Sequence, residues 1–125
     1  MSRWFAFVTA APLLAAAQGC VMGDAVSKFN ETKARAYMAS MKSDLRELAD
    51  SLAAYRAKHG RYVVGTASNA DGKVTSEFAA DFKFAPTFDV TVRVDTSAGQ
   101  WTATASHALT PKTCVLVPGG QPTCK

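Results

Sequence analysis

The sequence is poor in the residues from which most catalytic and metal sites are built. It has only two histidines, His59 and His107, and neither stands at the short spacing from another ligand that metal ions require. No serine lies in a G-x-S-x-G context, and no glycine-rich phosphate loop follows a predicted strand. The sequence therefore favours a non-enzymatic protein with no metal and no cofactor. His59 then suits the last turn of a helix, and His107 the end of a strand.

Charge of one sign is not concentrated in any segment. The formal net charge is +4, but lysine and arginine are interspersed with acidic residues along the chain. Binding to nucleic acid requires a clustered basic surface, so we expect no nucleic-acid partner. Three acids, Asp44, Glu47 and Asp50, recur at three-residue spacing on a predicted helix, where we expect solvated charge and not an acid–base pair.

Long apolar runs are also missing. The longest apolar stretch, residues 4–17, is interrupted by Pro12 and has 14 residues, whereas a membrane-spanning helix needs roughly 20. A short apolar core after Arg3, followed by small residues, is typical of a signal peptide. We therefore expect residues 1–20 to be an export signal, residues 21–125 to form the mature domain, and the protein to be periplasmic or at the cell surface.

Cysteine is scarce, with three residues, and the odd number leaves one of them without a partner. Cys114 and Cys124 enclose the turn-rich segment VLVPGGQPT, so we expect them to form a disulfide in an exported protein. Two interpretations of Cys20 stay open. AQGC resembles a bacterial lipobox, in which Cys20 is lipidated, whereas the three alanines at 15–17 match an ordinary signal-peptidase site.

Proline and glycine are absent from residues 24–59, which predicts one long helix. Its apolar residues recur mostly at spacings of three and four and form a single stripe: Val26, Phe29, Tyr37, Met41, Leu45, Leu48, Leu52 and Tyr55. Such a helix is about 54 Å long at 1.5 Å per residue, while a domain of this size is roughly 35 Å across. We therefore expect its N-terminal third to project, or to pack on something outside this chain.

The C-terminal third alternates between apolar and polar residues. In TFDVTVRVDT the apolar set Phe88, Val90, Val92 and Val94 is expected to face a core, and WTATASH and TCVLV follow as further strands. We expect an α+β fold, in which the C-terminal half of the helix packs on a small antiparallel sheet of three to four strands within residues 86–117. Leu45, Leu48, Leu52 and Tyr55 are then expected to meet Trp101, and residues 61–85 form a connection.

The segment AYMASMKSDLRELA, together with the following Tyr55, RAKHG and Tyr62, resembles the major helix of bacterial type IV pilins and pseudopilins. The stretch WTATASHALTPKTCVLVPGG is similar to the end of such proteins, where the last strands precede a loop closed by cysteines. The likeness covers roughly residues 26–125 and implies a pilin-like fold. It also implies a non-enzymatic subunit of a type IV pilus (fimbrium) or of a type II secretion-like apparatus. Its partners would be other pilin or pseudopilin subunits, or further copies of itself.

The resemblance does not extend to the N-terminus. Pilins have an apolar segment after a short leader, which anchors the subunit in the membrane and later forms the filament core, and residues 1–27 contain no such segment. The chain is thus interpreted as a subunit or as a membrane-tethered derivative of one, held at the inner or outer membrane by its leader or a lipid. The alternative is a periplasmic or lipid-anchored small binding or adhesion module with no filament role.

Overall fold

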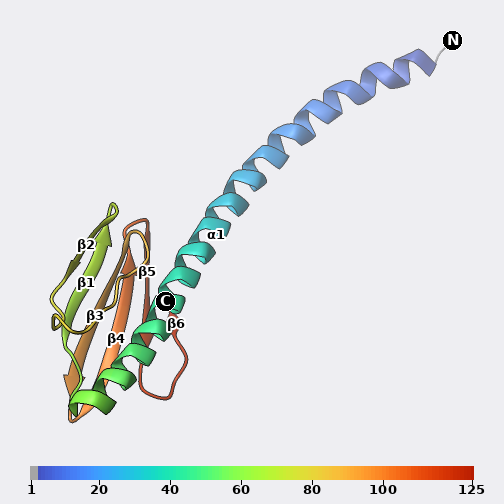
Figure 1. Ribbon diagram of the computed structural model, residues 1–125. Helices are drawn as coiled ribbons and strands as arrows, with labels where there is room; N and C mark the ends of the chain where they lie inside the picture. Colours follow the sequence, from blue (N-terminus) through green and yellow to red (C-terminus); the bar gives the residue numbers. More distant parts are fainter. Residues whose placement is uncertain (1–2) are drawn as a thin grey trace. The chain divides into compact units, whose positions relative to one another are not determined.

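The chain forms one long helix followed by six strands (Figure 1). The structure is a computed structural model that describes the backbone of residues 3–125 and the side chains of residues 30–125. Helix α1 spans Arg3–His59, and the strands are β1 (Gly65–Ala70), β2 (Lys73–Ser76), β3 (Val90–Ser97), β4 (Gln100–His107), β5 (Thr110–Leu116) and β6 (Thr123–Cys124). The chain divides into two compact units, Met1–Ala34 and Arg35–Lys125. The second unit contains the whole sheet.

The six strands form one antiparallel sheet in the order β2-β1-β3-β4-β5-β6. The predicted small sheet of three to four strands is therefore wrong. Strands β3, β4 and β5 were expected, whereas β1 and β2 lie in the segment predicted as a connection and β6 lies beyond the predicted sheet.

The missed strands lack the alternation by which a strand is recognised. In β1 only Ala67 is buried, and every residue of β2 is exposed. Both strands form because β1 pairs with β3 and a tight turn returns the chain to β2. In that turn Asp71 and Gly72 have φ of 54° and 82°, as a two-residue hairpin requires. The predicted connection thus contains a tight turn, but the residues on both sides of this turn form paired strands.

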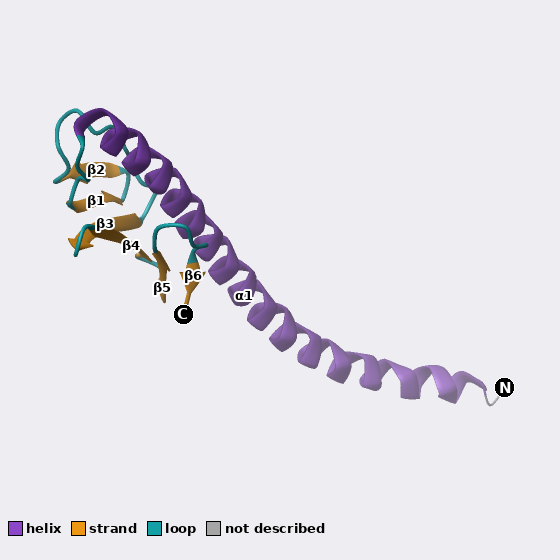
Figure 2. Cartoon of the chain, turned by 90° about the horizontal axis from the view of Figure 1, so that it is seen from below, coloured by secondary structure: helices purple, strands orange, loops and turns teal. Residues whose placement is uncertain are grey.

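The C-terminal part of α1 lies along one face of the sheet (Figure 2). The stripe residues Met41, Leu45, Leu48 and Leu52 have no solvent exposure, and Tyr55 has little. They form one core cluster with residues of β3, β4 and β5, namely Val90, Val92, Val94, Trp101, Ala103, Ala105, Cys114 and Leu116. Burial of apolar area of this extent is the main favourable term for the domain.

The helix ends where the sequence predicts. Gly60 adopts a φ of 75°, and its N–H donates to the carbonyl of Arg56 at 2.8 Å, which closes the last turn. The segment from 77 to 89 then connects β2 to β3. It is attached to the core through Phe78 and Phe82, both buried, with Phe84 half-buried beside them. This segment therefore belongs to the packed domain.

Candidate functional site

Asp44 is a buried carboxylate on the inner side of α1. It is 2% exposed, whereas the sequence predicted a solvated charge. The backbone N–H of Thr87 donates to Asp44 Oδ2 at 2.8 Å, and the Thr87 hydroxyl donates to Oδ1 at 2.7 Å. Position 44 is three residues after Met41 and four before Leu48, so it falls on the apolar stripe. This position on the stripe is the feature of the sequence that could have indicated burial of Asp44. A buried carboxylate must be hydrogen-bonded, so burial also implies a partner.

We expect Asp44→Ala to reduce the free energy of unfolding by about 1–3 kcal/mol, since both donors of Thr87 lose their acceptor. Asp44→Asn retains one acceptor oxygen and should lose less. Glu47→Ala, on the exposed side of the same helix turn, is the control and should change stability by less than about 0.5 kcal/mol. Urea denaturation followed by circular dichroism measures all three variants. Equal losses for Asp44→Ala and Glu47→Ala would contradict the assignment.

A second cluster of polar side chains lies at the C-terminal end of α1. Asp81 accepts a hydrogen bond from the Tyr55 hydroxyl at 3.3 Å and lies 3.1 Å from His59 Nε2. Arg61 reaches the same hydroxyl at 3.5 Å, and the rings of Tyr55 and His59 are 4.1 Å apart. These groups bond to one another, and together they fix the segment containing Asp81 against the helix end. Positioning of that segment is a structural role, and it accounts for these contacts without any catalytic function.

His107, the other histidine, stacks on Tyr37 with ring centroids 4.2 Å apart. Its Nδ1 accepts the backbone N–H of Leu109 at 3.1 Å, within the turn between β4 and β5. The two histidines therefore make separate contacts, His59 with Asp81 and His107 with Tyr37. In residues 30–125 no three acidic, histidine or cysteine side chains come together in a way that could hold a metal ion.

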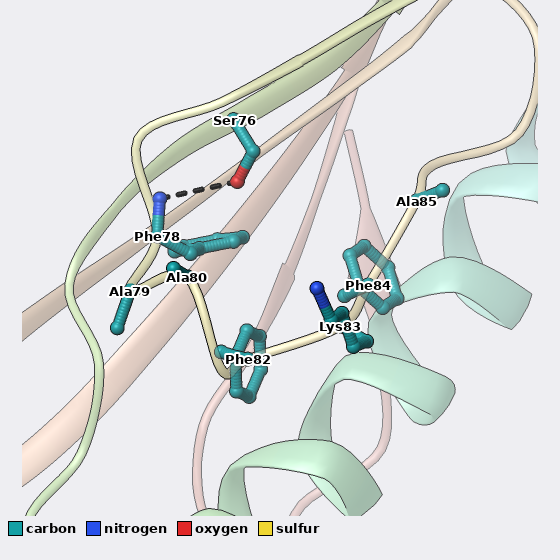
Figure 3. Close-up of a pocket in the computed structure, with 8 residues that line it drawn as sticks. All are labelled: Ser76, Phe78, Ala79, Ala80, Phe82, Lys83, Phe84 and Ala85. Carbon is teal, nitrogen blue, oxygen red and sulfur yellow. Dashed lines mark hydrogen bonds between the residues drawn. The ribbon is translucent and has the colours of Figure 1, made fainter.

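One hollow, of about 680 Å³, is formed by one chain segment (Figure 3). Its lining comes from residues 76–85 and includes Phe78, Phe82, Lys83 and Phe84, with the Phe78 N–H donating to Ser76 Oγ at 3.1 Å. The lining offers one ammonium and one hydroxyl but no carboxylate or imidazole. An acid–base pair is therefore not available within it.

The structure places the predicted site residues as follows. Cys114 and Cys124 form a disulfide and face each other across β5 and β6, which confirms that prediction. Leu45, Leu48, Leu52, Tyr55 and Trp101 are all buried within the domain core. Their side chains are therefore not available for contact with a second molecule, in contrast to the predicted role in assembly. Cys20 and the predicted signal peptide lie among residues whose side chains the structure does not describe.

Within the part of the chain whose side chains are described, no helix segment is both long and apolar enough to span a membrane.

No family model matches the chain, and neither a characterised protein nor a solved structure matches it. The function must therefore be inferred from the geometry of the chain itself.

Proposed function

We propose that the chain is a non-enzymatic, pilin-like subunit of a type IV pilus or a type II secretion-like apparatus, or a membrane-tethered derivative of one. In this proposal the protein is exported, and residues 35–125 form its globular domain. The partners are other subunits of the apparatus or further copies of this chain.

The observation that carries the proposal is the change in burial along α1. From Met41 to Tyr55 the apolar stripe is buried by the sheet, and Tyr37 and Met38 are half-buried against the domain, but no side chain of residues 30–36 is buried. A helix in water normally depends on tertiary packing of one face for its stability. A helix that continues well beyond the sheet-covered stripe is what a subunit needs if it contacts neighbours through that helix.

A second observation supports an extracytoplasmic location. The last strand is joined to the sheet by the Cys114–Cys124 disulfide, and such bonds persist in oxidising compartments. The turn between Val117 and Gly120 is closed by a backbone hydrogen bond of 3.1 Å within the disulfide loop. Lipidation of Cys20 stays a prediction, which belongs to the membrane-tethered form of the proposal.

Photo-crosslinking of the full chain in cells tests the proposal. A benzophenone amino acid at Ala36, which is exposed on α1 before the covered stripe begins, should give adducts with another copy or another subunit. The matched control is Ala53, which is also exposed on α1 but lies within the sheet-covered part of the helix. Ala53 should give few adducts.

Two results would count against assembly through the helix. One is the absence of adducts at Ala36, and the other is an equal yield at both positions, which indicates random collision. Either result would favour the alternative of a small binding or adhesion module without a filament role.

A further inference from the structure

The face of the sheet opposite α1 carries hydroxyl side chains in register. One row crosses five strands from β2 to β5 and consists of Thr75, Ser68, Thr91, Ser106 and Thr113. The next row contains Thr66, Arg93, Thr104, Val115 and Thr123. None of these ten side chains is buried. Because neighbouring strands are about 4.8 Å apart, the hydroxyls form a regular array, which we call the hydroxyl face.

The hydroxyl face carries few charges although the chain is basic. Its two rows contain one charged residue, Arg93; the carboxylate of Asp95 lies 3.1 Å from Arg93 Nε, and the carboxylate of Glu77 accepts the backbone N–H of Thr66 at 3.0 Å. The formal net charge of +4 is therefore carried elsewhere in the chain. Exposed positions are normally rich in lysine and glutamate, so a face on which hydroxyls far outnumber charges points to a ligand that is recognised mainly by hydrogen bonds to hydroxyls.

A groove lies in the middle of this face. It has a volume of about 510 Å³ and is lined by Thr66, Thr91, Arg93, Asp95, Thr104 and Ser106. Four of the six side chains are hydroxyls that both donate and accept hydrogen bonds, while Arg93 donates and Asp95 accepts. The Arg93 side chain is 65% exposed, so its Nη groups are accessible from the groove. The volume is that of a small-ligand site.

We propose that this groove binds a neutral polyhydroxylated ligand, namely a stretch of polysaccharide. Sugar hydroxyls also donate and accept, which matches a lining of threonine and serine flanked by one donor and one acceptor. A phosphate or sulfate would meet the repulsive carboxylate of Asp95. A protein partner would find one apolar side chain, Val115, in the two rows, whereas the centre of a protein interface is apolar.

The two rows contain no aromatic residue on which a sugar ring could stack, so binding depends on hydrogen bonds exchanged against water. Each groove is therefore a weak site, with a dissociation constant in the millimolar range. The proposal stands on this face alone and does not depend on the helix-mediated assembly proposed above.

The test is a titration of the full ¹⁵N-labelled chain, followed by NMR, with three soluble probes: cellohexaose, maltohexaose and chitohexaose. At least one should produce saturable shifts at millimolar concentration, concentrated at Thr66, Thr91, Arg93, Thr104 and Ser106. The double variant Thr91→Val/Thr104→Val keeps side-chain shape but removes two groove hydroxyls. It should weaken binding by about tenfold or more. The control Thr75→Val/Thr123→Val, on the same face outside the groove, should bind as the original chain does.

Several outcomes would overturn the proposal. These are the absence of saturable shifts with all three probes, shifts outside the groove, and an equal effect of the two double variants. Shifts at these residues that depend on protein concentration without any sugar would show instead that the face joins two copies. Larger shifts with inorganic phosphate than with any sugar would show an anion site.

Discussion

Replacing Leu48 by alanine is expected to lower the free energy of unfolding by about 2–5 kcal/mol, the range for large-to-small changes in a packed core. Leu48 has no solvent exposure and lies in the middle of the helical stripe, between Leu45 and Leu52. The core around it includes Ala103 and Ala105, whose side chains cannot extend to fill the space left behind. The cavity term should therefore add to the lost transfer free energy.

The control for this variant is Arg46→Ala, an exposed position in the same turn of α1. It should change stability by less than about 0.5 kcal/mol. Urea denaturation of the full chain, with the slope compared between variants, separates a change in stability from a change in the unfolded state. A loss for Leu48→Ala as small as that for Arg46→Ala would mean that the stripe is not packed on the sheet.

Removing the disulfide with the double change Cys114→Ala/Cys124→Ala should cost about 2–4 kcal/mol. The bond joins residues ten apart, at the place where β6 pairs with β5. Beyond the disulfide, β6 is held by Val115 opposite Thr123 and by two hydrogen bonds of 3.0 and 3.1 Å between Thr113 and Lys125. A strand of two residues has too few contacts to stay paired once the bond is removed.

Reductant provides the matched comparison for the disulfide. Adding it to the original chain should lower the melting temperature to that of the double variant, while the double variant should not respond. Mass spectrometry without reduction should find the peptides of Cys114 and Cys124 joined, with two hydrogens fewer than the free thiols. Two cysteines that react fully with an alkylating reagent before reduction would refute the bond.

The parts of the fold that follow from strong periodicity could be predicted from the sequence. The apolar stripe of α1 and the alternating residues of β3 and β4 each repeat a pattern over several residues. The end of the helix is marked by Gly60. The turn between these two strands has φ of 53° at Ala98 and 78° at Gly99, and glycine is the residue that most readily adopts such a conformation. In these segments local preference and tertiary packing agree, and so the pattern alone was sufficient.

The size of the sheet could not be predicted in the same way. Strands at the edge of a sheet bury little, so their residues need not alternate, and pairing of the backbone decides their structure. Thr66, Ser68 and Thr75 read as loop residues in isolation, yet Thr66 and Ser68 pair with β3 and Thr75 pairs with Ser68. The hydroxyl face was missed for the same reason, because it exists only when strands distant in sequence are aligned.

Asp44 shows a different limit. Its spacing from Glu47 and Asp50 suggested a solvated face, but its spacing from Met41 and Leu48 places it on the stripe, and the two patterns conflict. The partner that resolves the conflict, Thr87, lies 43 residues away in sequence. The sequence alone offered no means of pairing them.

The order of elements along the chain has a consequence for folding. The covered stripe of α1 precedes every strand that covers it, so it leaves the ribosome or an export channel first and has no partner at that moment. The core closes only when β5 has joined β4, since Cys114 and Leu116 complete the cluster. Contacts so distant in sequence make folding slow compared with that of a helical bundle of this length. During that interval the leucines of the stripe are exposed to water, so the partly folded chain is prone to aggregation.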